Sequence, residues 1–378
     1  MLHQWRPTSR AAHRSTVITD LFAPPAGQLL THSGLLSAGY SPHEIRRAVV
    51  TGALTALTRG SYTAGQAYRA SSAEAQHLLR ARSRGLGSPS VVLSHVSAAV
   101  VHGIPVPPDA LAAVHVTRSG RGGSRRGSGV WQHAAVLAAG DVTVVDEVAV
   151  TAPSRTLVDL SRWMSFENAV IAEDVALRVY PGLVTELPDV LLKARHLPGA
   201  GAARRALEFS DGRAESPGES RTRVLLHREG LPTPELQCEI FDDRGSFVGR
   251  VDLAIPDCGV VVEFDGMVKY GDLLRGKLTA GQVLAREKRR EDQIRELGWM
   301  VVRLTWSDLA DPVRTGSRLR SAMTRGRRLK DVSGLVGTHR CTPPIRIGTP
   351  DVRGSAASFE ATARSVRVVA PANSPEQR

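Results

Sequence analysis

GRVDLAIPDCGVVVEFDG, residues 249–266, has the pattern of a β-hairpin. Two apolar, β-branched runs flank a tight turn at residues 257–258. Pairing across this two-residue loop places Asp252 directly opposite Glu263. Asp265 lies on the same face of the hairpin as Glu263, because side chains alternate along a strand with a period of two. The stretch therefore predicts a hairpin with three carboxylates on one face.

The opposite face of this hairpin is expected to be apolar throughout, with Val251, Leu253, Ile255, Val260, Val262 and Phe264. Like charges directly opposite each other destabilise a sheet, so a carboxylate pair kept there needs a compensating cation. A hard divalent ion with oxygen ligands, such as Mg²⁺, fits this need. A simpler interpretation stays open: Arg250 pairs in register with Asp265 as a surface ion pair, and the other two acids are solvated neighbours.

The segment before the hairpin has the signature of a capped helix over residues 216–230. Ser216, Pro217 and Glu219 fit the N-cap, N1 and N3 positions of a capping box. Glu219 is therefore either the capping acid or a third functional carboxylate that points across to the hairpin.

The remaining elements around the hairpin follow from hydrophobic patterning. Residues 236–241 predict a further antiparallel strand, which the turn at 242–245 joins to the hairpin. Residues 283–298 predict a charged helix, and residues 299–306 predict a buried strand. The expected order is helix, three strands, helix, strand.

This order, together with ES at 219–220, the hairpin, REKRRED and LGWMVVRLTW, resembles the PD-(D/E)XK, restriction-endonuclease-like fold. Within that fold it is most similar to the branch of the very-short-patch-repair endonuclease. The resemblance covers residues 213–311 and implies a Mg²⁺-dependent DNA endonuclease. The family's acids fall on four residues of this chain, Glu219, Asp252, Glu263 and Asp265, of which Asp252 and Glu263 would hold the metal.

The chain departs from this family at its last motif position. Asp265 stands where the family often has a lysine, so a lysine would have to come from Lys269 or Lys288. In such a site the metal activates water and stabilises charge on the phosphodiester. Magnesium binds through only one or two carboxylates. Glu219 or Asp265 would then be an auxiliary ligand or would orient the base.

The composition of the whole chain indicates a nucleic-acid partner. The 378 residues predict two or three domains. The net charge of +12 is of the kind that phosphate backbones attract, although a general richness in arginine would produce it too. Only 4% of residues are aromatic, which argues against recognition of single strands by base stacking and favours duplex DNA.

The cysteines and the apolar runs argue against several other classes of protein. Cys238, Cys258 and Cys341 are scattered and odd in number, so we expect neither a zinc site nor a disulfide. No apolar run approaches the length that spans a bilayer, and the N-terminus lacks an apolar signal-peptide core. A soluble, cytoplasmic protein without a membrane partner is expected.

Residues 26–65 predict a winged helix-turn-helix. Helices are expected over 28–39 and 41–52, the second with a capping box, followed by a hairpin over 53–65. The second helix would enter the major groove. The side chains expected to meet DNA are His43, Arg46 and Arg47 on this helix and Arg59 in the wing. Alternatively, the segment is a small structural module with solvated arginines.

This N-terminal segment resembles the N-terminal domain of AbiEi-family antitoxins, which are transcriptional repressors of type IV toxin–antitoxin systems. The resemblance implies duplex DNA and a cognate toxin as partners.

The middle region, residues 70–205, is expected to be mixed α/β. Strands predicted over 113–118 and 130–136 flank a glycine-rich loop that either binds phosphate or is a flexible turn. Its arginines are Arg118, Arg121, Arg125 and Arg126. The histidines here show no metal-ligand spacing and are expected to be satisfied core residues; they are His95, His102, His115 and His133.

Two further segments are expected to lack packed structure. Residues 195–215 have the Ala-, Gly- and Arg-rich composition of a linker, and residues 331–378 that of a disordered tail. The predicted whole is an α+β, mixed α/β protein with a winged helix, a middle region and an endonuclease-like domain. Two functions compete: a Mg²⁺-dependent endodeoxyribonuclease, and a non-catalytic transcriptional regulator of antitoxin type. A regulator has no need for Asp252 opposite Glu263.

Overall fold

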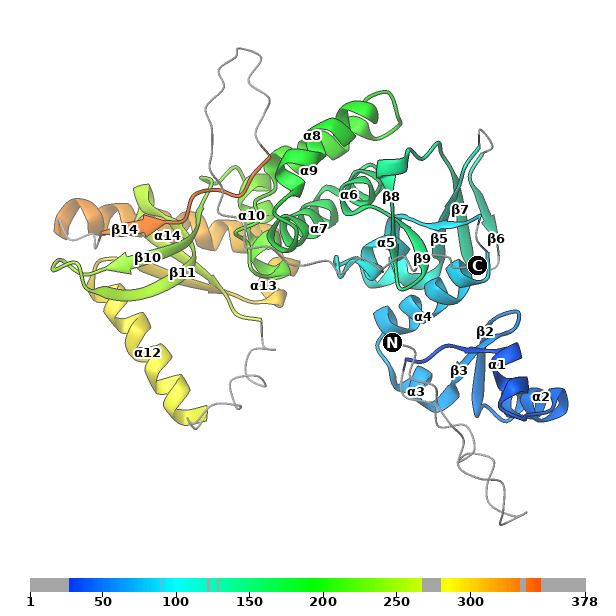
Figure 1. Cartoon of the computed structure of the whole chain (residues 1–378). Coiled ribbons are helices and arrows are strands. Elements are labelled where there is room, and N and C mark those ends of the chain that lie inside the picture. Colours follow the sequence, from blue (N-terminus) through cyan, green and yellow to red (C-terminus); the bar gives the residue numbers. More distant parts are fainter. Residues whose placement is uncertain are drawn as a thin grey trace, which may run out of the picture. The chain divides into compact units, whose positions relative to one another are not determined.

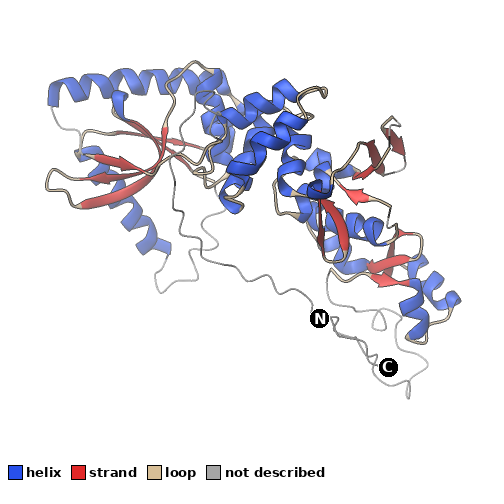
Figure 2. Cartoon of the chain, turned by 45° about the horizontal axis from the view of Figure 1, so that its top comes forward, coloured by secondary structure: helices blue, strands red, loops and turns tan. Residues whose placement is uncertain are grey.

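The protein was analysed as a computed structural model, and its fold is mixed α/β, as expected (Figures 1 and 2). The structure describes residues 27–88, 90–120, 123–127, 129–266, 280–333 and 338–347. These ranges contain helices and three sheets. None of their helices is both long and apolar enough to cross a membrane.

The N-terminal part combines two helices with a three-stranded sheet of order β1-β3-β2. Its elements are β1 Leu30–Thr31, α1 His32–Ser37, α2 Pro42–Val50, β2 Leu54–Thr58, β3 Ser61–Ala64 and α3 Gly65–Ala70. The predicted capping box of α2 is confirmed: the Glu44 amide donates to Ser41 Oγ at 3.2 Å, and the Ser41 amide donates to the Glu44 carboxylate at 2.8 Å. The predicted hairpin of β2 and β3 is also confirmed.

The first predicted helix is shorter than expected. Thr31 ends the extended segment and caps α1, because its Oγ1 accepts from the Gly34 amide at 3.0 Å. Leu30 and Thr31 instead pair with β3. The apolar residues before Thr31 therefore extend a sheet rather than a helix.

The middle part contains a six-stranded sheet of order β6-β7-β5-β4-β9-β8. Its strands are β4 Val92–Leu93, β5 Val114–Arg118, β6 Arg125–Gly127, β7 Val130–Ala134, β8 Val142–Val145 and β9 Val148–Thr151. The strands predicted over 113–118 and 130–136 are confirmed as β5 and β7, which are parallel neighbours. Helices α4 Ala73–Leu86 and α5 His95–Val101 contact this sheet.

Four helices follow: α6 Pro153–Ser161, α7 Phe166–Val179, α8 Leu183–Lys193 and α9 Ala200–Phe209. The predicted linker over 195–215 is wrong, because it contains α9. This helix contacts α7 and buries Ala203, Ala206 and Leu207. Their spacing of three to four residues gives a helix with one apolar side. The small side chains that suggested a linker are the ones packed in the core.

The C-terminal part is built on a five-stranded sheet of order β13-β12-β11-β10-β14. Its elements are α10 Pro217–Arg228, β10 Glu235–Phe241, β11 Phe247–Ile255, β12 Val260–Phe264, α12 Ala280–Glu296, β13 Met300–Leu304, α13 Trp306–Ala310, α14 Pro312–Ser333 and β14 His339–Cys341. The predicted order of helix, three strands, helix and strand is confirmed. Helices α12 and α14 cover opposite faces of this sheet (Figure 1).

The prediction of a disordered tail from residue 331 is wrong for its first part. β14 pairs with β10, and a disulfide joins Cys341 to Cys238 of the neighbouring strand. The expectation of no disulfide is therefore wrong as well. Residues 348–378 of the predicted tail lie outside the described residues.

Both faces of the predicted hairpin are buried, and β11 changes face at Asp252. Leu253 packs in the cluster with α14, whereas Val251 packs with Trp299 in the cluster on the α12 side. The expectation that Val251 shares the face of Leu253 is wrong. In β10, Leu236 and Cys238 divide between the same two clusters. Between them Gln237 has a φ of 52°, which breaks the alternation of side chains.

Candidate functional site

The register of β11 and β12 positions Asp252 next to Glu263. Leu253 pairs with Val262 in the antiparallel ladder of β11 and β12, so the next residues along, Asp252 and Glu263, are opposite each other. The predicted register is therefore confirmed. Asp252 is half-buried, and its Oδ2 accepts a hydrogen bond from the Phe264 amide at 3.0 Å. This bond fixes the carboxylate at the end of the ladder.

Glu219 reaches the same place from the start of α10. Its carboxylate accepts hydrogen bonds from the Glu215 amide at 2.9 Å, from Ser216 Oγ at 2.8 Å and from Gln237 Nε2 at 2.9 Å. Burial, together with the charge of Asp252, raises the pKa of Glu219 to about 7. The capping box predicted at Ser216 is only half formed: the Glu219 amide donates to Ser216 Oγ, but the Glu219 carboxylate accepts from the Glu215 amide and not from the Ser216 amide. Glu219 also lies within the electrostatic reach of Asp252.

The negative charge of Glu263 is partly balanced by two arginines of the chain itself. Arg290 Nη2 on α12 donates to Glu263 Oε1 at 3.0 Å, and Arg303 Nε on β13 lies 3.5 Å from Oε2. Burial raises the pKa of Glu263 and outweighs the lowering by Arg290. The charge of Asp252 raises it as well. Asp252 therefore interacts with both glutamates.

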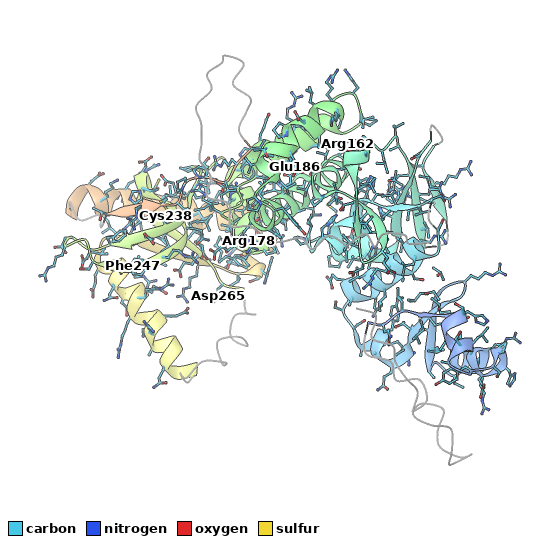
Figure 3. The ribbon with its side chains drawn as sticks, in the orientation of Figure 1. Arg162, Arg178, Glu186, Cys238, Phe247 and Asp265 are labelled. Atoms are coloured by element: carbon cyan, nitrogen blue, oxygen red, sulfur yellow. A yellow bond between two sulfur atoms is a disulfide. The ribbon has the colours of Figure 1, made fainter. Side chains whose placement is uncertain are left out.

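The other predicted site residues are placed differently. Asp265 follows the end of β12 (Figure 3). Its amide donates to the Leu304 carbonyl. Arg250 pairs with Glu215 at 2.9 Å, so the ion pair expected with Asp265 is wrong. Lys288 is exposed on α12, and the cation of α12 that contacts the acids is Arg290. Lys269 lies outside the described residues.

The carboxylates do not form a preorganised three-ligand cluster. In the described ranges, the sets of three or more ligand atoms that lie within 4.8 Å of one another are His95 with His115 and His133, and Glu235 with Cys238 and Cys341. A magnesium site needs only one or two carboxylates, and waters complete its shell. Asp252 and Glu263 therefore suffice as protein ligands.

The raised pKa of Glu219 predicts a pH dependence of stability. Its folded pKa of about 7 lies above the usual 4.5, so its contribution is complete below pH 4.5 and is lost as pH rises through 7. Glu219→Gln should flatten the fall in unfolding free energy between these pH values, by up to about 3 kcal/mol. Urea denaturation at a series of pH values measures this slope. Glu208→Gln, an exposed residue of α9, should leave it unchanged; an equal slope in both variants would contradict the assignment.

The predicted DNA-facing residues of the N-terminal part are exposed. His43, Arg46 and Arg47 lie on α2, whose other side buries Ile45 and Ala48. Arg59 is exposed in the turn between β2 and β3. One face of α2 is therefore free of core contacts and carries positive charge.

The described arginines of the glycine-rich loop in the middle part are exposed; they are Arg118, Arg125 and Arg126. The Arg126 guanidinium also lies 3.7 Å from the centroid of the Trp131 ring. Arg121 lies outside the described residues.

Comparison with known proteins gives relatives without an assigned function. No family model matches the chain. Uncharacterized proteins from two strains of Mycobacterium tuberculosis, CDC 1551 and H37Rv, are each 34% identical over 179 residues. The match covers 47% of this chain and 62% of the length of each relative. Any function of this chain therefore has to be argued from its own site.

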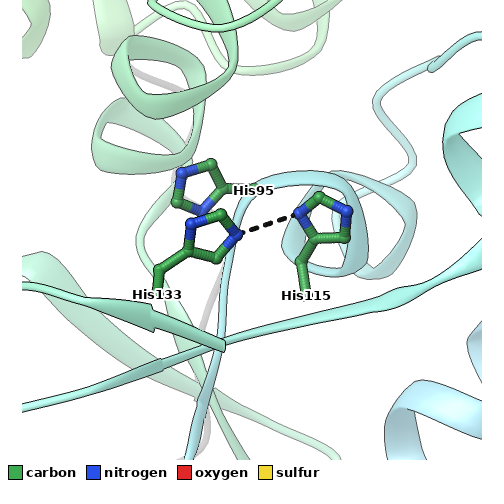
Figure 4. Close-up of side chains that lie close together, drawn as sticks. All are labelled: His95, His115 and His133. Carbon is green, nitrogen blue, oxygen red and sulfur yellow. Dashed lines mark hydrogen bonds between the residues drawn. The ribbon is translucent and has the colours of Figure 1, made fainter. Parts of the chain in front are cut away.

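Three histidines that were each expected to be a satisfied core residue lie together. They are His95, His115 and His133, and their ligand nitrogens lie within 4.8 Å of one another (Figure 4). His115 and His133 come from adjacent parallel strands, in which Thr117 pairs with His133. Only the pairing of β5 with β7, which the sequence does not give, brings them side by side. His102 instead binds the Thr151 carbonyl at 2.8 Å.

Proposed function

We propose that the chain is a DNA-binding protein whose C-terminal part, residues 213–311, hydrolyses phosphodiester bonds in duplex DNA with Mg²⁺. The observation that supports this most is the carboxylate pair Asp252–Glu263, with buried Glu219 beside it. Directly opposed like charges cost stability. They also lie where Gln237 has an unfavourable backbone conformation, and such strain concentrates at functional sites.

The donor set fits magnesium, because carboxylate oxygens are the hard ligands that this ion prefers. Asp252 and Glu263 would hold the ion, which when bound supplies an activated water and charge stabilisation at the phosphate. Arg290 is held to the sheet by a hydrogen bond from Nη1 to the Arg250 carbonyl at 2.7 Å. It would supply the positive charge at the phosphate that a lysine supplies in the related family. Glu219, with its pKa near 7, can accept or release a proton at neutral pH.

Incubation of the purified protein with supercoiled plasmid tests this function. Nicked or linear DNA should appear with Mg²⁺ and should be absent with EDTA. Intact plasmid in both lanes, also with Mn²⁺, would refute the nuclease.

A second function is favoured by the arginines that already pair with Glu263. Arg290 and Arg303 neutralise this acid without a metal, and Lys288 does not contact it. The C-terminal part would then only bind DNA, in a transcriptional regulator of antitoxin type with a cognate toxin. Such a regulator would bind DNA with EDTA present and would leave plasmid intact.

Both functions place residues 26–65 on duplex DNA as a winged helix-turn-helix, with α2 in the major groove. The exposed arginines of α2 would contact phosphates, and each contact contributes to the salt dependence of binding. Arg46 and Arg47 together should account for about 2 units in the slope of log affinity against log salt.

Arg46→Ala/Arg47→Ala should accordingly weaken binding and flatten the slope by about 2 in a filter-binding titration. Arg204→Ala/Arg205→Ala, a pair of exposed arginines on α9, is the matched control and should have a smaller effect. Equal slopes in the α2 variant and the wild type would show that α2 does not contact the DNA phosphates.

A further inference from the structure

Three imidazoles from three separate elements meet in the middle part of the chain (Figure 4). His95 begins α5, His115 lies on β5 and His133 on β7. His133 Nε2 lies 3.1 Å from His115 Nδ1. The rings of His95 and His133 are stacked, with their centroids 3.7 Å apart.

The spacing of these nitrogens suits a tetrahedral metal. At Zn–N bonds of about 2.0–2.1 Å, two ligands of a tetrahedral ion are about 3.3 Å apart. The His115–His133 pair has nearly this separation, and the ligand atom of His95 lies within 4.8 Å of both. The rings of His95 and His133 are nearly parallel, so one of them would have to turn for three nitrogens to face one ion.

Burial disfavours the charged form of all three rings: it lowers the pKa of His115 to about 2, that of His133 to about 4, and that of His95 well below its usual value. A neutral imidazole has one lone pair. Because the contact between His133 and His115 is an N–H···N hydrogen bond, one of these rings would change tautomer when both bind a metal.

The surroundings hold the rings in place. Ser94 Oγ lies 3.1 Å from His95 Nδ1 and accepts from Thr117 Oγ1 at 2.8 Å. The Trp131 ring lies 4.9 Å from that of His115. His95 has a φ of 47°, which is uncommon for a residue with a side chain and marks a conformation kept by its surroundings.

Two of the three arginines near this cluster are paired with carboxylates, and the third, Arg126, lies over the Trp131 ring. Arg155 lies 2.8 Å and Arg162 3.1 Å from the two oxygens of Asp159. Arg155 also contacts Asp141 at 3.0 Å. These pairs reduce the repulsion that a bound cation would meet.

We propose that His95, His115 and His133 bind one transition-metal ion of the zinc type, with the fourth coordination position left to water or another ligand. Three imidazole nitrogens favour zinc, copper or nickel over magnesium, calcium or manganese. The site is therefore chemically distinct from the carboxylates of the C-terminal part. The hydrogen bonds of Ser94 are the kind of outer contact that orients metal-bound histidines.

Metal retention tests this site in the full chain. The protein is loaded with Zn²⁺ without reductant, so that Cys238 and Cys341 stay in their disulfide, and is then dialysed against metal-free buffer. Wild type should retain about one zinc per chain. Loaded with Co²⁺ instead, it should show the visible absorption of a tetrahedral site.

His133→Gln should lower zinc affinity about tenfold or more and remove the Co²⁺ absorption. His196→Gln, an exposed histidine outside the cluster, should behave as wild type. Equal retention by His133→Gln and wild type would overturn the proposal. Wild-type protein that retains no zinc and shows no Co²⁺ absorption would also overturn it. This second outcome does not depend on whether the variants fold.

Discussion

Asp252→Asn is expected to abolish Mg²⁺-dependent cleavage of DNA while leaving the affinity for duplex DNA nearly unchanged. Asparagine keeps the shape of the side chain, and its oxygen can still accept from the Phe264 amide. It removes the negative charge that would hold the metal. Plasmid nicking and filter binding on the same preparation measure the two effects. Cleavage at the wild-type rate would exclude Asp252 as a metal ligand.

The same substitution, which should abolish cleavage, should not destabilise the metal-free protein. Asp252 raises the pKa of both Glu219 and Glu263, so its charge repels both of these glutamates. Removing this charge should leave the unfolding free energy unchanged or raise it by some tenths of a kcal/mol. A loss of several kcal/mol, in a wild type that never nicks plasmid, would make the carboxylates structural and favour the regulator.

Arg223→Ala should destabilise the fold by about 3–5 kcal/mol. Arg223 Nη1 lies 2.6 Å from Asp174 Oδ2, and both side chains are almost fully buried between α10 and α7. The Asp174 carboxylate would keep the hydrogen bonds from Ser220 Oγ and the Asp211 amide but lose the cation that pairs with it. A buried charge without its partner is costly. Urea denaturation measures the loss.

Arg228→Ala is the matched control for this variant. It removes another α10–α7 ion pair, with Glu167 at 3.0 Å, but the Arg228 side chain is 51% exposed. Exposed pairs contribute less than about 1 kcal/mol. Similar losses in the two variants would show that burial does not determine the strength of these contacts.

The parts of the fold that the sequence predicted depend on local chemistry. The turn between β11 and β12 spans residues 256–259, four rather than the predicted two, and contains a 3-10 turn at Pro256–Cys258. Its centre is where the sequence predicts it, so the register that brings Asp252 and Glu263 together could be counted from it. The capping box at Ser41 is complete within four residues. Such features need no knowledge of the rest of the chain.

The parts that the sequence did not predict depend on partners distant in the chain. Cys238 and Cys341 are 103 residues apart and meet only because β14 joins the sheet. α9 is recognisable as packed only once α7 is beside it. The three histidines need the pairing of β5 with β7, and the change of face at Asp252 needs the left-handed backbone of Gln237. Arg290, which pairs with Glu263, could not be distinguished in the sequence from the other charged residues of α12.

Binding of Mn²⁺, a stand-in for Mg²⁺, tests most directly whether the carboxylates hold a divalent ion. The fall in the electron paramagnetic resonance signal of free Mn²⁺ reports the bound fraction. The wild type and Asp257→Asn, an exposed acid in the turn of the same hairpin, should bind Mn²⁺ equally. Asp252→Asn should bind much less. Equal binding by Asp252→Asn and wild type, or no binding by wild type, would contradict a metal site at Asp252 and Glu263.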